Sequence, residues 1–224
     1  MLKALLFDLD GTLTHSDPVH FETWAELLKG YGLTINLDFY KVHFNGRLNE
    51  HIIQDLLPQL SVDEGIQLSR YKEAEFRRRA ATVLRPLAGL DVLLPWMNQR
   101  ALKRAVVTNA PRDNAYFILQ TLNFDEIFPV VILGEELERG KPDPLPYTFA
   151  LDGLDIAPEE AIVFEDSPSG VQAAVAAGIP TVGIASSQPP EILYQAGATL
   201  VVSDFSDRRL FEQLLEPTEP LLSV

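Results

Sequence analysis

Short apolar runs alternate with longer amphipathic stretches along most of the chain. Each run is rich in aliphatic residues and is followed by turn-forming residues, as expected for buried strands. The runs are Leu2 to Phe7, Arg104 to Thr108, Val130 to Leu133, Ala161 to Phe164, Thr181 to Ile184, and Thr199 to Val202. Helical patterns separate the later runs, at Leu90 to Arg100, Arg112 to Leu122, Pro144 to Leu154, Pro168 to Ala177, and Pro190 to Ala196. This alternation predicts an α/β fold with a doubly wound, mainly parallel sheet.

One long interval interrupts the alternation. About 95 residues separate the first run from the second, whereas a strand–helix–strand unit needs only ~30. Apolar residues recur at helical spacing inside it: Phe21, Trp24, Leu27, Leu28 and Tyr31, then Ile52, Leu56 and Leu57, then Ile66, Leu68, Tyr71 and Phe76. We therefore expect a helical cap domain of residues 15–82, inserted into a Rossmann-like core of residues 1–14 and 83–224. The cap would lie above the carboxyl ends of the strands.

Composition narrows the classes of function. The chain has 224 residues, of which 46% are hydrophobic, and 32 acidic residues against 18 basic ones give a net charge of −14. This charge argues against nucleic-acid binding and against an anionic membrane surface. The absence of cysteine excludes disulfides, a thiol nucleophile and cysteine-based metal sites. No apolar run approaches the ~18 residues of a membrane helix, so we expect a soluble cytoplasmic protein, compatible with a monomer.

The first apolar run ends in two carboxylates. Asp8 and Asp10 stand two residues apart, and Gly11 follows them at a turn. Parallel sheets place ligands at the carboxyl ends of their strands, and two adjacent acids repel each other unless a cation lies between them. A divalent cation with oxygen ligands would meet that need. The alternative is a hairpin turn with two solvated acids.

A hydroxyl and an amide side chain follow the second run. Thr108, Asn109 and Ala110 precede a helix that opens near Pro111, and the free backbone N–H groups of that helix would converge with them. This combination suits a phosphate group. An ordinary helix cap by Thr108 or Asn109 is the alternative.

Two further strand ends carry charged residues. Lys141 lies in a stiff proline-flanked loop, where it could neutralise clustered carboxylates and a phosphoryl oxygen; a solvated lysine is the alternative. Glu165 and Asp166 end the fourth run, before a helix that Ser167 would cap. They could instead be surface acids that offset a helix dipole. Right-handed crossovers would bring all these strand ends to one edge of the sheet.

The four strand-end motifs resemble those of the haloacid dehalogenase superfamily. The segment Asp8 to Thr12 resembles the first motif, Thr108 the second, Lys141 the third, and Glu165 with Asp166 the fourth. Their order matches along essentially the whole chain. The early helical insertion resembles the C1-type cap of the β-phosphoglucomutase and phosphoglycolate phosphatase branch.

This resemblance implies phosphoryl transfer with Mg²⁺ as cofactor. Asp8 would attack phosphorus and form an aspartyl phosphate. Asp10 would protonate the leaving oxygen and then deprotonate the attacking water. Mg²⁺ would be held by Asp8, the backbone carbonyl of Asp10, Asp166 and waters, with Glu165 in or near that shell. The phosphoryl group would be held by Gly11, Thr108, Asn109, Ala110 and Lys141.

The same resemblance indicates substrate contacts in the cap. His20 resembles a histidine at the start of the first cap helix of β-phosphoglucomutases, and a lone polar helix residue is the alternative. The segment from Phe44 to Glu50 resembles the substrate loop of the branch, with Gly46, Arg47 and Asn49 as candidates. Mutases tend to carry an arginine where this chain has Asn49, so the loop departs from the mutase pattern.

The preferred hypothesis is a Mg²⁺-dependent phosphatase that acts on a small phosphomonoester, either a sugar phosphate or a phosphoglycolate-like compound. The alternatives are a phosphomutase of the β-phosphoglucomutase type and a catalytically silent protein that binds a phosphorylated ligand. Asp10 disfavours a dehalogenase, because a halide leaving group needs no protonation. The basic cluster from Arg70 to Arg85, with Glu73 and Glu75 interleaved, is interpreted as a solvated, paired helix face. Alternatively, one of the arginines Arg77 to Arg79 could hold a distal phosphate or carboxylate.

Overall fold

Among the residues that the structure describes, six strands form the central sheet. The computed structural model describes residues 1–44 and 47–215. The strands are β1 (Ala4–Phe7), β2 (Lys103–Thr108), β3 (Val131–Leu133), β4 (Ala161–Glu165), β5 (Thr181–Ile184) and β6 (Leu200–Val202), in the order β3-β2-β1-β4-β5-β6. Every neighbouring pair is parallel. The predicted fold class is therefore confirmed, and the strands lie within two residues of the apolar runs.

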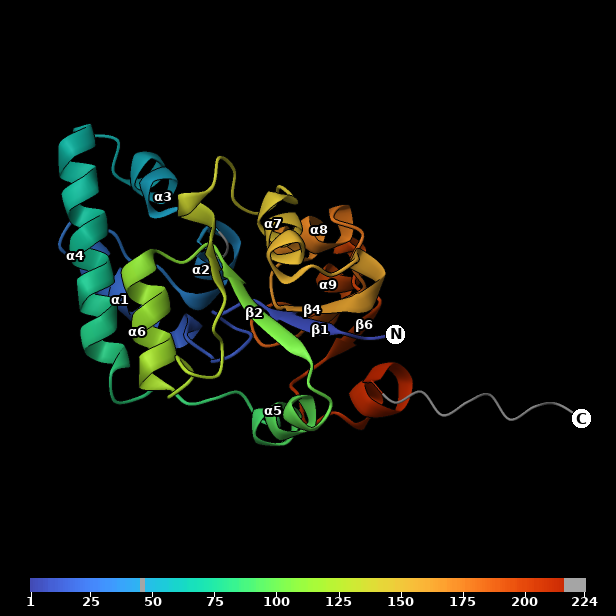
Figure 1. The fold of residues 1–224 in the computed structure, drawn as a ribbon. Coiled ribbons are helices and arrows are strands. Elements are labelled where there is room, and N and C mark those ends of the chain that lie inside the picture. Colours follow the sequence, from blue (N-terminus) through green and yellow to red (C-terminus); the bar gives the residue numbers. More distant parts are fainter. Residues whose placement is uncertain (45–46, 216–224) are drawn as a thin grey trace, which may run out of the picture.

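Helices cover both faces of this sheet (Figure 1). They are α5 (Leu90–Gln99), α6 (Arg112–Thr121), α7 (Leu145–Leu154), α8 (Pro168–Ala176) and α9 (Pro190–Ala196), with short helical turns at Gly134–Glu136, Pro158–Glu160 and Leu210–Leu215. Alternate residues of a strand point to opposite faces. Accordingly, Leu5 and Phe7 of β1 pack into the core beneath α5 and α6, whereas Ala4 and Leu6 pack beneath α7 and α8. Because both faces are covered, the central strands are apolar throughout, and this made them recognisable as continuous runs.

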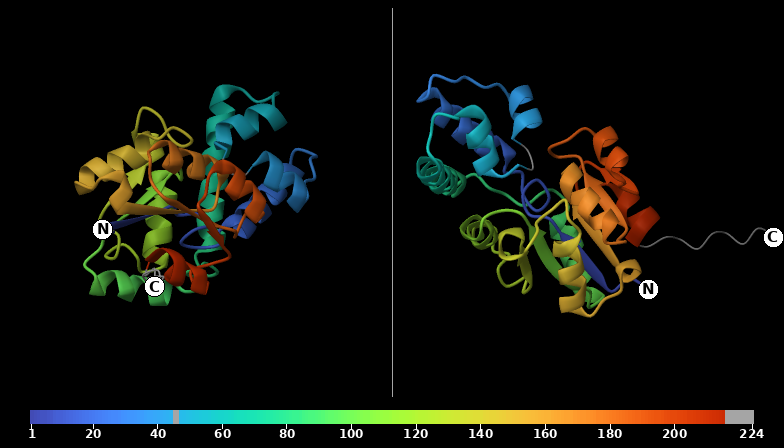
Figure 2. Two further views of the ribbon diagram at one scale, coloured as in Figure 1. Left: turned by 90° about the vertical axis from the view of Figure 1, so that its right-hand side faces the viewer. Right: turned by 90° about the horizontal axis from the view of Figure 1, so that it is seen from above.

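Of the helices described between β1 and β2, the first four lie at the carboxyl ends of the strands (Figures 1 and 2). They are α1 (Asp17–Lys29), α2 (Leu37–His43), α3 (Asn49–Leu56) and α4 (Val62–Ala80). These helices enclose an apolar cluster of their own, which includes Trp24, Leu28, Tyr40, Phe44, Ile52, Ile53 and Leu57. Helix α4 begins at a capping box, in which the Ser61 hydroxyl accepts from the Glu64 N–H and the Glu64 carboxylate accepts from the Ser61 N–H. The interval between the first two strands is thus helical, and the division into a cap domain of residues 15–82 and a core of residues 1–14 and 83–224 stays a prediction.

The two connections between these helices and the core run side by side. The hydroxyl of Thr14 donates to the Arg85 carbonyl over 2.7 Å, and the Leu87 N–H donates to the Leu13 carbonyl over 2.9 Å. The cap therefore joins the core through two adjacent segments just beyond the end of β1. Within the described residues, no helix has both the length and the apolar character that a membrane span requires.

Candidate active site

Three charged residues from separate strand ends meet at the carboxyl edge of the sheet. The Nζ atom of Lys141 donates to Oδ1 of Asp8 over 2.7 Å and to Oε1 of Glu165 over 2.5 Å. It also donates to the Val107 carbonyl over 2.6 Å. Asp166 completes a group of three acids, because ligand oxygens of Asp8, Glu165 and Asp166 lie within 4.8 Å of one another.

The parallel register of the central strands explains this convergence. Phe7 of β1 is aligned with Val106 of β2 and Phe164 of β4. The residues that follow these positions are therefore brought to the same edge. The Asp8 N–H extends the ladder by donating to the Phe164 carbonyl over 2.9 Å, which fixes the backbone that carries the carboxylate.

Burial disfavours the ionised form of the carboxyl groups of Asp8 and Asp166. Burial raises the pKa of Asp8 to about 8, although the adjacent Lys141 acts in the opposite direction. Burial, together with Asp8 and Glu165, also raises the pKa of Asp166 well above its ordinary value. One lysine thus faces three buried carboxyl groups, and these supply only oxygen donors. Such a set fits a hard divalent cation, whose charge would keep the carboxylates ionised.

Gly11 allows the backbone to pass close to this acidic group. Its φ of +78° lies in the left-handed region that glycine adopts without strain. A Cβ atom at this position would lie 2.1 Å from Oδ2 of Asp166. The glycine is therefore required both by the turn and by the room that the Asp166 carboxylate occupies.

Asp10 occupies a different environment from Asp8. The Ser16 hydroxyl donates to Oδ1 of Asp10 over 2.5 Å, and Nε2 of His20 lies 3.7 Å from the same oxygen. Burial alone would raise the pKa of Asp10, but His20 and Ser16 outweigh it and lower the pKa below its ordinary value. Asp10 is therefore an ionised carboxylate in this environment. It could donate a proton only after a phosphoester binds nearby, because the negative charge of the ester raises the pKa of an adjacent carboxyl.

The residues after β2 form hydrogen bonds with other groups of the protein, whereas the sequence predicted that they hold a phosphate group. The Thr108 hydroxyl accepts from the Ala110 N–H over 2.9 Å. The Asn109 amide donates to the Lys141 carbonyl over 3.0 Å and accepts from the Lys141 N–H over 3.1 Å. Asn109 thus holds the loop that carries the lysine, and a direct phosphate contact by Thr108, Asn109 or Ala110 stays a prediction.

Several supporting residues were not found from the sequence. The Tyr147 hydroxyl donates to Oε1 of Glu165 over 2.9 Å, and its ring lies 5.0 Å from the Lys141 ammonium. The Ser187 hydroxyl donates to the side chain of Asp166 and, over 3.1 Å, to its carbonyl. Because serine and tyrosine are common on helices and loops, only their place in the fold distinguishes these two.

Two adjacent charges of α4 are buried, contrary to the interpretation of this basic region as a solvated face. The side chains of Lys72 and Glu73 are 3% and 9% exposed, and their charged atoms lie 2.8 Å apart. The Lys72 ammonium is also 2.8 Å from Nδ1 of His20. One sequence signal could have found them, since both lie one helical turn before the fully buried Phe76. The prediction of paired surface charges does describe Arg78 and Arg79, which both bond to Glu75.

The predicted substrate residues of the cap are distributed unevenly around the site. His20 faces Asp10 and stacks on Phe76 with ring centroids 3.8 Å apart, so it is part of a packed network. The Asn49 amide points inward and donates to Glu73. Arg47 is exposed and pairs with Asp55 over 2.6 Å. Gly46 lies outside the described residues, and substrate contact by all four stays a prediction.

The comparisons with known proteins agree with this arrangement. Residues 5–184 match the family model described as haloacid dehalogenase-like hydrolase. The chain therefore belongs to the haloacid dehalogenase-like hydrolases, as its motifs predicted.

Individual relatives match nearly the whole chain. The validoxylamine A 7'-phosphate phosphatase of Streptomyces hygroscopicus subsp. limoneus is 36% identical over 204 residues, which cover 89% of this chain and 93% of that protein. The beta-phosphoglucomutase of Bacillus subtilis (strain 168) is 28% identical over 222 residues, which cover 93% and 92%. The crystal structure of a HAD hydrolase, family IA, variant 3, from Entamoeba histolytica HM-1:IMSS superposes with a TM-score of 0.83 at 27% identity, covering 92% of this chain and 94% of that one.

Proposed function

We propose that this protein is a Mg²⁺-dependent phosphatase that hydrolyses a small phosphomonoester, a sugar phosphate or a phosphoglycolate-like compound, through an aspartyl phosphate. The observation that carries the proposal is the buried contact between Lys141 and Asp8 beside Glu165 and Asp166. It provides a carboxylate nucleophile, a fixed cation and an oxygen-donor metal site at one edge of the sheet. The named phosphatase among the relatives supports the same reaction class.

Each residue has a defined task in this reaction. An oxygen of Asp8 attacks phosphorus as the bond to the leaving oxygen breaks, and Lys141 balances the charge of the phosphoryl oxygens. Asp10 gives its proton to the leaving oxygen and later takes one from the water that cleaves the aspartyl phosphate. Mg²⁺, held by Asp8, the Asp10 carbonyl, Asp166 and Glu165, would offset the repulsion between Asp8 and the phosphate dianion.

A phosphomutase is the second candidate, because a beta-phosphoglucomutase is similar over nearly the whole chain. Both reactions would pass through the same aspartyl phosphate. They differ in whether water or a second hydroxyl of the sugar accepts the phosphoryl group, which depends on how the cap excludes water. Asn49 favours the phosphatase, since a mutase must hold a second phosphate with its cap. A cytoplasmic location and a monomeric state stay predictions of the sequence.

The test is phosphate release with Mg²⁺ across a panel of small phosphomonoesters, with β-glucose 1-phosphate and a trace of glucose 1,6-bisphosphate included. We expect free phosphate from one or a few members of the panel. Asp8→Asn should reduce turnover at least about a thousandfold, whereas Asp152→Asn, the same change at an exposed position of α7, should not. Glucose 6-phosphate formed without free phosphate would establish the mutase instead. No turnover of any member would overturn both reactions.

A further inference from the structure

Ser187, in the loop after β5, is bonded to one of the three acids of the site. Its hydroxyl donates to Oδ2 of Asp166 and, over 3.1 Å, to the Asp166 carbonyl. The residue is buried, so this contact is shielded from competing water. The proposed reaction gives Ser187 no task, although the serine is bonded directly to a proposed metal ligand.

Two further hydrogen bonds fix the loop that carries Ser187. The Ala185 N–H donates to the Val202 carbonyl over 2.8 Å, which continues the pairing of β5 with β6. The Ser186 hydroxyl donates to the Gly11 carbonyl over 2.5 Å. The backbone that leads to Ser187 is therefore tied both to the neighbouring strand and to the turn after β1.

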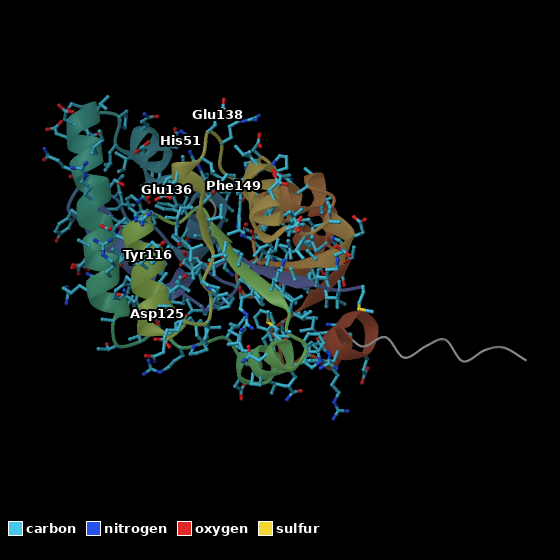
Figure 3. The ribbon with its side chains drawn as sticks, viewed as in Figure 1. His51, Tyr116, Asp125, Glu136, Glu138 and Phe149 are labelled. Carbon is cyan, nitrogen blue, oxygen red and sulfur yellow. The ribbon has the colours of Figure 1, made fainter. Side chains whose placement is uncertain are left out.

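This loop reaches the acids from the side opposite to the lysine of the site. In the sheet, β1 and β4, which lead into Asp8 and Asp166, lie between β3 and β5. Lys141 follows β3, and Figure 3 labels Glu136 and Glu138 on the segment between β3 and the lysine. Lys141 bonds to Oδ1 of Asp8 from one side, and the loop after β5 bonds to Oδ2 of Asp166 from the other.

Each of these two acids keeps one carboxylate oxygen unbonded. Among the described residues, no hydrogen bond reaches Oδ2 of Asp8 or Oδ1 of Asp166. Within the same part of the chain, only Oγ1 of Thr12 is an enclosed side-chain polar atom without a hydrogen-bond partner. The two unbonded oxygens are therefore in contact with solvent, where a cation can reach them.

A carboxylate with one oxygen held by a hydroxyl binds a cation through its other oxygen. Oδ2 of Asp166 is enclosed by Ser187 and by Gly11, where a Cβ atom would lie only 2.1 Å from it. Mg²⁺ favours such single-oxygen binding, because it demands near-octahedral coordination and retains several waters. Ca²⁺ is larger and readily takes both oxygens of one carboxylate.

We propose that Ser187 is a positioning residue for the metal site, which holds Oδ2 of Asp166 so that the carboxylate binds through Oδ1 alone and the site favours Mg²⁺ over Ca²⁺. This inference rests on the Mg²⁺ site of the proposed phosphatase function. Ser187 acts through Asp166 and touches neither the metal nor the substrate.

The experiment titrates the protein with MgCl₂ and, separately, with CaCl₂ at constant ionic strength and without substrate. Each dissociation constant follows from the rise in melting temperature with metal concentration. We expect Ser187→Ala to weaken Mg²⁺ binding about 10- to 100-fold, the usual cost of losing a residue that orients a metal ligand. Ca²⁺ binding should change little, because the released Asp166 can bind Ca²⁺ with both oxygens. The ratio of the two dissociation constants should therefore shift at least about tenfold toward Ca²⁺.

Control variants separate the hydroxyl from the rest of the loop. Ser187→Thr, which keeps a hydroxyl, should stay near the wild-type ratio. Ser203→Ala, the same change at an exposed position after β6, should leave the ratio unchanged. If Ser187→Ala does not fold, Ser187→Cys replaces it, because a thiol is a weak donor, and the same direction of shift is expected.

An unchanged ratio would overturn the inference, including one in which both metals bind more weakly by the same factor. An equal shift in Ser187→Thr or in Ser203→Ala would also overturn it. Wild-type protein that binds no Mg²⁺ would overturn both the inference and the metal site of the proposed function. Wild-type protein that binds Mg²⁺ but hydrolyses no monoester would overturn the phosphatase alone, so the two failures are distinguishable.

Discussion

Asp8 and Asp10 are identical side chains two positions apart, and their surroundings shift their pKa values in opposite directions. Burial among other acids raises the pKa of Asp8 to about 8, whereas His20 and Ser16 lower the pKa of Asp10. Two carboxyl groups whose pKa values are displaced in opposite directions are suited to separate roles. In the proposed reaction Asp8 would need a cation before it could act as the nucleophile, whereas Asp10 is already ionised.

The acid role of Asp10 can be tested with leaving groups of different basicity. We expect Asp10→Asn to reduce turnover of a sugar phosphate about 10²- to 10⁴-fold, because an alkoxide leaving group needs a proton. The loss with p-nitrophenyl phosphate should be much smaller, since nitrophenolate leaves without one. The measurement is kcat for both substrates, with Asp152→Asn as the control. Equal losses on both substrates would contradict an acid role for Asp10.

At the scale of elements, β4 and α8 approach so closely that only glycine fits between them. A Cβ atom at Gly170, in the first turn of α8, would lie 1.8 Å from Oε1 of Glu165 at the end of β4. The helix also begins at this point, where the Ser167 hydroxyl accepts from the Gly170 N–H over 3.1 Å. The N-terminus of α8 therefore packs directly against the carboxylate that holds Lys141.

Replacing this glycine should disturb both stability and activity. We expect Gly170→Ala to lower the free energy of unfolding by about 1 to 3 kcal/mol, because the new methyl group overpacks the junction, and to reduce phosphatase turnover by displacing Glu165. Urea unfolding and phosphate release measure the two effects. Gly153→Ala in α7, where the added Cβ meets no atom within 4 Å, should be neutral or more stable by about 0.5 kcal/mol. If both variants behaved alike, the close approach would not be the cause.

At the scale of the whole molecule, the cap and the core are joined by ionic and amide contacts as well as by two adjacent chain segments. Asn114 of the core accepts from Arg77 and donates to Glu73, both on α4 of the cap. Glu73 contributes to this connection because it is buried and ionised and accepts hydrogen bonds from Asn49 on one side and from Asn114 on the other.

The contribution of Glu73 to stability should depend on pH in a defined direction. Its pKa in the folded protein is about 2, below the ordinary value of 4.5, so its stabilisation is complete above pH 4.5 and is lost as the pH falls toward 2. We expect Glu73→Gln to be less stable than wild type by about 3 kcal/mol at pH 7, with the difference shrinking between pH 4.5 and pH 2. Denaturant unfolding across this range measures it, beside Asp152→Asn. A difference that stayed constant with pH would show that the lost contact is not ionic.

The sequence by itself determined the sheet and the catalytic edge. Buried parallel strands are continuous apolar runs. Asp8, Glu165 and Asp166 stand at the ends of such runs, so local pattern was sufficient to place them at one edge, whereas Lys141 lies in the loop after β3 and reaches the same edge through its bonds to Asp8 and Glu165. Helix α2 was not predicted because it has only seven residues and little periodicity, although Asn36 caps it by accepting from the Phe39 N–H.

Only the tertiary structure decided which polar residues are buried and what they contact. Glu73 and Asn114 are 41 positions apart, and Asp166 and Ser187 are 21 apart. Neither pairing follows from local spacing, because it depends on how the cap lies against α6 and on where the loop after β5 turns. The different pKa shifts of Asp8 and Asp10 are likewise caused by side chains from other parts of the chain. Local pattern sets which segments become strands and helices, whereas burial and charge depend on what folding brings beside each side chain.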